Sequence, residues 1–273
     1  MSLKGTAKST LEILSAGAYV APSGTRRSIQ PALRLAIEDT RLYRPGEVGP
    51  FYEIPAASSA QIEVVEGTTQ AWAQILVEEQ GVRDLVLLDF ASARNPGGGF
   101  LNGAKAQEED LARCSGLYPC LLDQPEYYDA NRDEPSMLYT DHLIYAPRVP
   151  FFRSRNRDLL EHPFLASVIV APAPNATQHL RREPQGHDDI TRTLRRRASL
   201  VLGVAKDAGH RTLLLGAWGC GVFGNEPSVV ARAFGSWLDT EPFAKAFDRV
   251  MFAIYDGTRD QRTLGAFQAQ FGV

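Results

Sequence analysis

Two adjacent glutamates follow a run of three glycines, and these residues are the best suited to chemistry in the chain. Gly97-Gly98-Gly99 is followed, after seven residues, by Gln107-Glu108-Glu109-Asp110. Three glycines leave one side of a loop without Cβ atoms, so backbone N–H groups can approach a ligand, and the N-terminus of a following helix favours an anion. Nearby negative charge raises the pKa of a carboxyl, and a protonated carboxyl is a general acid. The pattern indicates acid catalysis beside a bound anion.

A simpler explanation is that the acidic residues only complement the helix dipole, which stabilises a helix by about 0.3–1 kcal/mol. Neighbouring helical residues point about 100° apart, so Glu108 and Glu109 cannot share one task. Most glycosidases instead place two carboxylates on either side of the bond. If this chain cleaves a glycoside, one carboxyl must act first as acid and then as base.

A second glycine-rich loop follows another apolar run. It spans Gly216 to Gly224 and contains four glycines, and Asn225 and Pro227 are typical of a helix N-cap and first turn. The first loop has the spacing neither of a phosphate-binding Walker motif nor of the dinucleotide fingerprint G-x-G-x-x-G. Two such loops, each opening a helix, favour a ligand with more than one anionic or polar group, such as a dinucleotide-like diphosphate.

Short apolar runs alternate with segments of helical period, which predicts an α/β fold with a parallel or mixed sheet. The expected strands, buried on both faces, are Ile62–Val65, Leu85–Phe90, His142–Pro147, Ser167–Pro172, Thr212–Trp218 and Val250–Tyr255. The expected helices are Thr69–Gln80, Asn102–Cys114, Asp189–Asp207, Pro227–Thr240 and Arg259–Phe271. In such sheets ligands bind beyond the carboxyl ends of the strands, where both glycine loops would lie.

Residues 1–58 read as helical without a good strand, so we expect an N-terminal helical extension packed on a domain of residues 59–273. The chain has 273 residues, of which 44% are hydrophobic and 22% charged, with a net charge of −3. This composition excludes a disordered or fibrous protein. Binding to a nucleic-acid backbone relies on a net basic surface, and the charge of this chain is nearly balanced. No direct sequence-specific nucleic-acid binding is therefore expected.

No apolar run approaches the about 20 residues that span a bilayer, and the start of the chain has no long apolar segment typical of a secretory signal. We therefore expect a cytoplasmic protein without membrane contact. Three cysteines without a C-x-x-C pair and five scattered histidines argue against a disulfide framework or structural zinc. An arginine-rich stretch, Arg192 to Arg197, lies opposite an apolar helical stripe, and we expect these arginines on the solvated face.

The glycine run and the Gln-Glu-Glu sequence resemble the GGG-x6–8-QEE signature of poly(ADP-ribose) glycohydrolases. Two further segments, Tyr139–Arg153 and Gly216–Asn225, are similar to the bacterial-type branch of that family. The resemblance implies a macrodomain-like fold, a mixed sheet sandwiched between helices. It also implies hydrolysis of the ribose–ribose O-glycosidic bond of poly(ADP-ribose), with ADP-ribosylated proteins as partners and a role in the DNA damage response.

The resemblance also implies roles for individual residues. Glu109 would be the catalytic acid and base, and Glu108 would hold the hydroxyls of the scissile ribose. Tyr255 would stack on adenine. The other implied substrate-binding residues are Asn95, Gly97, Gly98, Gly99, Gln107, Gly221, Val222, Phe223 and Gly224. No metal and no cofactor are implied.

Two other functions compete with polymer hydrolysis. The chain could be a binding module that recognises ADP-ribose without cleaving it, or a hydrolase of mono-ADP-ribosyl protein or O-acetyl-ADP-ribose. Glu109 separates the first alternative from an enzyme, because a binding module needs the glycine loops but no general acid. The sequence leaves cleavage at chain ends or within the chain open.

Overall fold

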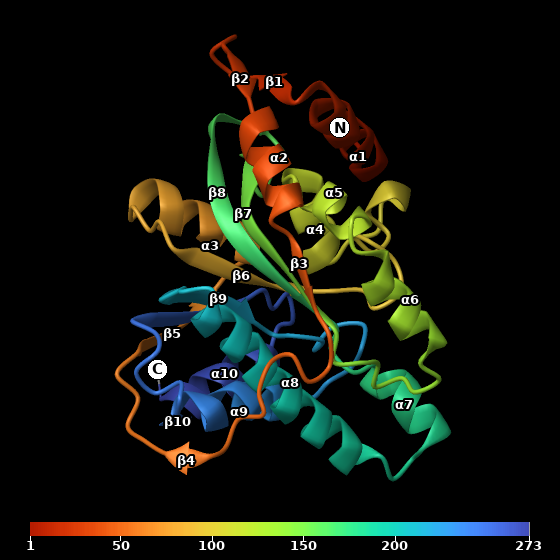
Figure 1. The fold of residues 1–273 in the computed structure, drawn as a ribbon, viewed down its shortest axis with the longest axis vertical. Helices are drawn as coiled ribbons and strands as arrows, with labels where there is room; N and C mark the ends of the chain where they lie inside the picture. The colour runs from red at the N-terminus through yellow and green to blue at the C-terminus, as the bar shows by residue number, and fades with distance from the viewer. Residues whose placement is uncertain (273) are drawn as a thin grey trace.

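The computed structural model describes residues 1–272, and its centre is a seven-stranded mixed sheet in the order β3-β7-β8-β6-β9-β11-β5 (Figure 1). Five strands run parallel to one another, while β7 is antiparallel to both β8 and β3. The strands of the sheet are β3 (Arg41–Tyr43), β5 (Gln61–Glu66), β6 (Leu85–Phe90), β7 (Leu143–Arg153), β8 (Leu159–Ala171), β9 (Thr212–Gly216) and β11 (Arg249–Ile254). Two further ladders pair β1 (Ala18–Val20) with β2 (Arg26–Ser28), and β4 (Ile54–Pro55) with β10 (Thr240–Glu241).

Helices cover both faces of this sheet. The helical segments are α1 (Leu3–Ala16), α2 (Gln30–Glu38), α3 (Thr69–Gln74), η1 (Ile75–Glu79), η2 (Phe100–Asn102), α4 (Gln107–Cys114), α5 (Leu117–Leu122), α6 (Pro125–Asp133), α7 (Ala176–Arg182), α8 (His187–Asp207), α9 (Pro227–Leu238) and α10 (Arg262–Phe271). Alternate residues of β6 enter two separate cores. Val86 and Leu88 pack with α8, α9 and α10, whereas Leu85 and Leu87 pack with α3, α4, α5 and α6. The sandwich predicted from the alternation of strands and helices is confirmed.

All six expected strands and five expected helices are present; Leu85–Phe90 has the predicted bounds, and the others differ at one or both ends. The segment expected as one helix from Asn102 to Cys114 is divided into η2 and α4, which begins only at Gln107. We expected β5 to be buried on both faces, and this was wrong. β5 is an edge strand of the sheet, its two end residues are exposed, and the residues between them are only partly buried.

The N-terminal segment contains α1 and α2, as expected, but the expectation that it holds no strand was wrong. β3 pairs with β7 and forms one edge of the main sheet, and β1 and β2 form a hairpin. Each of these strands has three residues, too few to show a period of two in the sequence. The division of the chain at residue 58 stays a prediction.

Helix α1 packs against the first glycine loop and against α4. Ala7 of α1 forms a buried cluster with Phe100 and Ala112, and Thr10 Oγ1 donates a hydrogen bond of 2.6 Å to the backbone oxygen of Arg113. The N-terminal helix therefore supports the helix that carries the two glutamates.

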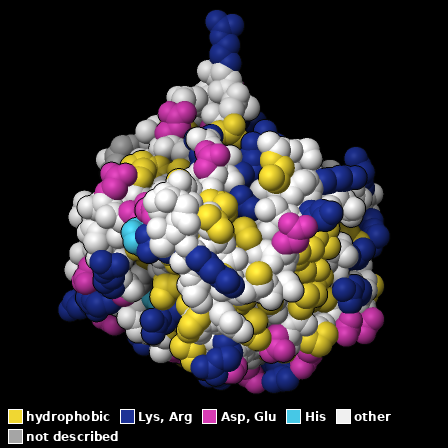
Figure 2. Space-filling model, turned by 90° about the horizontal axis from the view of Figure 1, so that it is seen from above, with side chains coloured by type: hydrophobic (Ala, Val, Ile, Leu, Met, Phe, Trp, Pro, Cys, Tyr) yellow, Lys and Arg dark blue, Asp and Glu magenta, His cyan; other side chains and the backbone are white. Residues whose placement is uncertain are grey.

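The surface agrees with the balanced composition. On the face drawn in Figure 2, Lys and Arg side chains lie between acidic and apolar ones.

The expectation that all the arginines of α8 are solvated was wrong for Arg197, which is fully buried. Its guanidinium donates to Asp141 Oδ1 at 3.1 Å and to the backbone oxygen of Pro172 at 2.5 Å, and these partners compensate for its burial. No helix within residues 1–272 combines the length and apolar character that crossing a bilayer requires.

Candidate active site

The two glycine loops leave the sheet from neighbouring strands at the same edge. The first follows β6 and the second follows β9, and these strands pair in parallel through Leu85–Leu87 and Thr212–Leu214. Because parallel strands end at the same edge of a sheet, the loops lie side by side, as the sequence predicts. The pairing of β6 with β9 ends at Leu87, whereas its pairing with β8 continues to the end of the strand at Phe90.

Gln107 fixes the helix that follows the first loop. Its side-chain oxygen accepts a hydrogen bond of 2.8 Å from the N–H of Phe90, and its nitrogen donates to the backbone oxygen of Leu88 at 2.8 Å and to Thr69 Oγ1 at 3.2 Å. These bonds tie the first residue of α4 to the last residues of β6. Gln107 therefore positions the helix, and its contact with a ligand stays a prediction.

The two glutamates are buried at the start of α4, and each is held by one oxygen. Glu108 Oε2 accepts a hydrogen bond of 2.7 Å from the N–H of Ser92, and Glu109 Oε1 accepts one of 2.9 Å from the N–H of Gly99. Glu108 is 3% exposed and Glu109 is 9% exposed. Glu108 Oε1 and Glu109 Oε2 are buried with no hydrogen-bond partner in the part of the chain that the structure describes. Each carboxyl thus keeps one fixed and one free oxygen.

The glycine run lies directly on these carboxyls. Gly98 has φ +59°, and a Cβ atom built there would overlap Glu109 Oε1 and lie 3.0 Å from Glu108 Oε2. A side chain at position 98 would displace both glutamates. Glycine is required here by the glutamates of the chain itself, in addition to any ligand.

Asp89, the fifth residue of β6, is a third carboxyl at the site that the sequence analysis missed. It is fully buried, and neither of its oxygens has a hydrogen-bond partner among residues 1–272. Burial raises the pKa of Asp89 well above its usual range, and the charge of Glu109 raises it further. A signal existed in the sequence, because Asp89 is the only polar residue in the apolar run Leu85–Phe90.

The pKa of Glu108 is also raised well above its usual range. Burial is the main cause and the charge of Asp89 the second, while the hydrogen bond from the N–H of Ser92 lowers it in part. The expectation that at least one carboxyl here has a raised pKa is confirmed, but the main cause is burial and not the charge of a bound anion.

Two tyrosines of α6 extend this group of buried polar atoms. The hydroxyls of Tyr127 and Tyr128 are buried, and neither has a partner among the described residues. Burial raises the pKa of Tyr127 well above its usual range, followed by the charges of Glu108 and Asp89. No helix was predicted over α6, so neither tyrosine could be placed near the glutamates from the sequence.

The second loop is held from behind by Asn225. Its side-chain nitrogen donates to the backbone oxygen of Pro174 at 2.8 Å and to that of Gly219 at 3.1 Å. The expectation that Asn225 caps α9 was wrong, because its side chain closes the loop and Glu226 occupies the N-cap position. At the front of the loop, Gly221 and Gly224 flank Val222, which is 87% exposed, and Phe223, which is half-buried with its ring centroid 6.1 Å from that of Tyr139.

The remaining predicted contacts lie near this edge but outside the buried group. Asn95 is exposed, and its backbone oxygen accepts a hydrogen bond of 3.0 Å from Gly98 in the turn that presents Gly97 and Gly99. Tyr255 follows the last residue of β11, is 61% exposed, and has the guanidinium of Arg155 at 5.4 Å from its ring centroid. Their roles in binding stay predictions.

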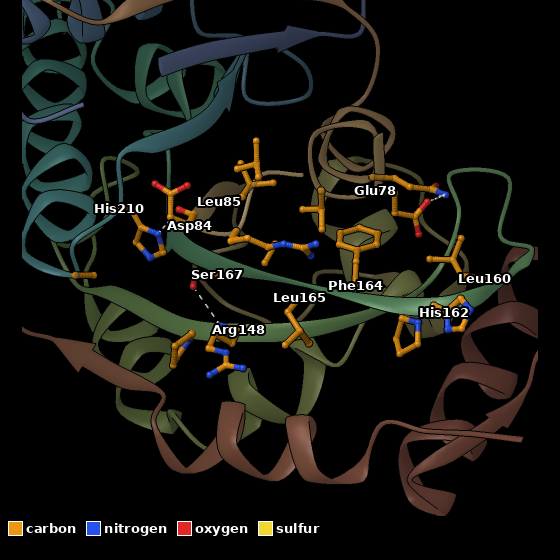
Figure 3. Close-up of a pocket in the computed structure, with 18 of the residues that line it drawn as sticks. Glu78, Asp84, Leu85, Arg148, Leu160, His162, Phe164, Leu165, Ser167 and His210 are labelled. Atoms are coloured by element: carbon orange, nitrogen blue, oxygen red, sulfur yellow. Dashed lines mark hydrogen bonds between the residues drawn. The ribbon is translucent and has the colours of Figure 1, made fainter. Parts of the chain in front are cut away.

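A large cleft of about 1210 Å³ lies elsewhere, beside the start of β6 and β9 (Figure 3). Its polar groups satisfy one another: the Tyr145 hydroxyl lies 2.8 Å from His210 Nε2, and His210 Nδ1 lies 2.5 Å from the backbone oxygen of Asp84. Because the glycine loops follow the opposite ends of these strands, this cleft is separate from the glutamates.

The chain is similar to known proteins in both sequence and structure. The family model of the microbial-type PARG catalytic domain matches residues 7–154. The chain is similar to the poly(ADP-ribose) glycohydrolase of Thermomonospora curvata bound to the inhibitor ADP-HPD, with 43% identity, coverage of 98% of this chain and 99% of that one, and a TM-score of 0.89. It is also similar to the enzyme of Deinococcus radiodurans in complex with ADP-ribose, with 42% identity, coverage of 89% and 98%, and a TM-score of 0.79.

No curated protein matches the chain. The family match covers the loop and helix that carry Glu108 and Glu109, and the structural similarity extends over nearly all of the chain. The chain therefore belongs to the microbial-type poly(ADP-ribose) glycohydrolase family.

Proposed function

We propose that this chain hydrolyses the ribose–ribose O-glycosidic bonds of poly(ADP-ribose) and releases ADP-ribose, with Glu109 as general acid and base. The observation that carries the proposal is the state of the Glu109 carboxyl. The N–H of Gly99 holds Oε1, while Oε2 is buried without a partner among the described residues. A general acid needs such a carboxyl, fixed in place with one oxygen available to the substrate.

In the proposed reaction, protonated Glu109 gives its proton to the oxygen of the leaving ribose as the glycosidic C–O bond breaks. The remaining sugar develops oxocarbenium character. The Glu109 carboxylate then takes a proton from a water molecule, whose oxygen bonds to the anomeric carbon and so restores the acid. One carboxyl thus serves both steps, unlike the two facing carboxylates of most glycosidases.

Glu108 is suited to holding the substrate. Its Oε2 accepts a hydrogen bond from the N–H of Ser92, and burial raises its pKa, which favours the protonated form more than in a free glutamate; when protonated, Oε1 can donate a hydrogen bond. A neutral carboxyl that donates to a ribose hydroxyl orients the sugar without adding negative charge beside the diphosphate. Glu108 and Glu109 then have different tasks, as their directions on the helix require.

The second loop is suited to the diphosphate. It lies beside the first loop at the same sheet edge, and the relatives from Thermomonospora curvata and Deinococcus radiodurans were solved with ADP-HPD and ADP-ribose. We propose that Gly221–Gly224 contact the diphosphate and that Phe223 packs beside the distal ribose. Contact with ADP-ribosylated proteins, a cytoplasmic location and a role in the DNA damage response stay predictions from the sequence.

The test is incubation with labelled poly(ADP-ribose), with ADP-ribose resolved from longer products. Glu109→Gln should lower hydrolysis by about 10²–10⁴, the typical contribution of a general acid–base group, while ADP-ribose affinity is kept. Glu79→Gln, at an exposed glutamate of η1, is the matched control and should hydrolyse like the wild type. Binding without hydrolysis by the wild type would support the binding-module alternative, and near-normal turnover by Glu109→Gln would remove Glu109 from its role.

A further inference from the structure

A second cluster of ionisable side chains lies where α7 meets α8. His179 lies in α7, Glu183 is the C-cap residue directly after this helix, and Asp189 lies in the first turn of α8. One potential ligand atom from each residue lies within 4.8 Å of the other two. None of the three belongs to the glutamate site or to the glycine loops.

His179 is the observation that sets this cluster apart from ordinary surface charges. Its side chain is buried, at 3% exposure, and its Nε2 has no hydrogen-bond partner in the part of the chain that is described. A buried polar atom left without a partner costs about 1–3 kcal/mol. Gly186 leaves room at this nitrogen, because a Cβ atom there would overlap Nε2.

The two carboxylates each keep an oxygen for a ligand. Asp189 Oδ1 pairs with Arg192, whereas Asp189 Oδ2 lies 3.9 Å from His179 Nε2. Glu183 is exposed, and its carboxylate forms no hydrogen bond or ion pair within residues 1–272. One buried imidazole nitrogen and two carboxylate oxygens thus lie within 4.8 Å of one another where α7 ends and α8 begins.

We propose that His179, Glu183 and Asp189 bind one divalent transition-metal ion, for which zinc is the best match. Imidazole and carboxylate ligands suit zinc, whereas magnesium prefers oxygen ligands alone. With zinc–ligand bonds of about 2.0–2.2 Å, a tetrahedral ion holds its ligand atoms roughly 3.3–3.6 Å apart. The side chains need to close by about 1 Å, and the exposed Glu183 side chain is free to do so; a water molecule would complete the shell.

The site would join α7 to α8 behind the second glycine loop. Thr177, in the first turn of α7, donates its N–H to the backbone oxygen of Phe223 at 3.0 Å. An ion that links the end of α7 to the start of α8 would stiffen the helix on which this loop rests. Its role is structural, and it takes no part in the steps assigned to Glu109.

Zinc binding is measured by isothermal titration calorimetry on tag-free, chelator-treated full-length protein, with thermal unfolding in parallel. We expect saturable binding of one zinc ion with a micromolar or lower Kd and a rise in Tm. His179→Gln and Glu183→Gln should each raise the Kd by more than about 100-fold, since the loss of an outer-shell partner already costs 10–100-fold. His187→Gln and Asp188→Asn, at exposed neighbours outside the cluster, are the matched controls and should bind like the wild type.

Two results would overturn the proposal: no saturable zinc binding by the wild type, or binding of normal strength by Glu183→Gln. Glu183 is exposed, so its variant should fold even if the one at buried His179 does not. A protonated His179 paired with Asp189 is the alternative explanation of the cluster, and it predicts the first of these results. No measurement here uses polymer hydrolysis, so the outcome is independent of the role of Glu109.

Discussion

At the scale of single residues, the close contact between Gly98 and the two glutamates explains why a glycine run precedes the helix that carries them. Gly98 has a positive φ and lies against the carboxyl of Glu109, while the next residue, Gly99, provides the N–H that holds the same carboxyl. The loop therefore sets the orientation of the Glu109 carboxyl. Glutamate position and loop conformation should change together when this glycine is replaced.

Gly98→Ala should lower polymer hydrolysis by at least about 10-fold, while the chain still folds with reduced stability. An alanine in the left-handed region costs roughly 1–2 kcal/mol, and its Cβ would also push Glu109 from its place. Urea unfolding and the labelled-polymer assay measure the two effects. Gly257→Ala, where a Cβ would meet nothing within 4 Å, is the control and should match the wild type. Full hydrolysis by Gly98→Ala would show that the contact has no influence on the acid.

Asp89 gives a prediction on pH and stability. Its pKa in the folded protein lies well above the usual value of 3.8, so above about pH 4 the folded chain holds a proton that the unfolded chain releases. The free energy of unfolding must then fall as the pH rises from this value. Asp89→Asn cannot ionise, so it should be more stable than the wild type at pH 8, with the difference disappearing towards pH 4.

Urea unfolding at a series of pH values checks this prediction, with Asp133→Asn, at an exposed aspartate of α6, as the control. The control should show no comparable gain at pH 8. If Asp89→Asn were less stable than the wild type at every pH, the carboxyl would have a stabilising partner, which the described structure does not show.

At the scale of elements, the sequence predicts the parts that repeat a pattern and misses those that follow from packing. Six strands and five helices were recognised because each carries several apolar residues in register. α6 was missed because most of its residues are polar, although it brings Tyr127 next to Glu108. The ligand set of His179, Glu183 and Asp189 was missed as well, because it depends on how α7 meets α8.

The second glycine loop gives a prediction at this scale. Phe223→Ala should raise the Kd for ADP-ribose by about 2- to 10-fold, since a well-packed aromatic contact is worth about 0.5–1.5 kcal/mol. The loop itself should stay in place, because Thr177 and Asn225 hold its backbone. Calorimetry with ADP-ribose measures the change, and Val20→Ala, at an exposed valine of β1, is the control. An unchanged Kd would mean that the loop has only a structural role.

At the scale of the whole molecule, the N-terminal segment and the rest of the chain share one sheet and one set of cores. β3 completes the sheet beside β7, Tyr43 and Val48 enter the core formed with α8, and Phe152 of β7 is buried among residues of α1 and β1. The sequence could not reveal this sharing, because the contacts join residues more than 100 positions apart, as between Thr10 and Arg113. Because residues 1–58 supply an edge strand and part of the core, we predict that they belong to the same folding unit as the rest of the chain.

A fragment of residues 59–273 should therefore fail to reach the native state. Without β3, the backbone of β7 becomes an unpaired edge. Without α1, the buried side chains of Phe152 and of Ala112 in α4 become exposed to solvent. Size-exclusion chromatography and near-ultraviolet circular dichroism should show an aggregated or loosely packed chain without polymer hydrolysis. Thr10→Val, which removes the bond to the backbone oxygen of Arg113 and the bond of 3.3 Å that Thr10 Oγ1 accepts from Arg153 Nε, should fold but lose about 1–3 kcal/mol of stability. A monomeric, fully active fragment would instead establish residues 1–58 as a separable extension and would place all support of Glu109 within the sheet domain.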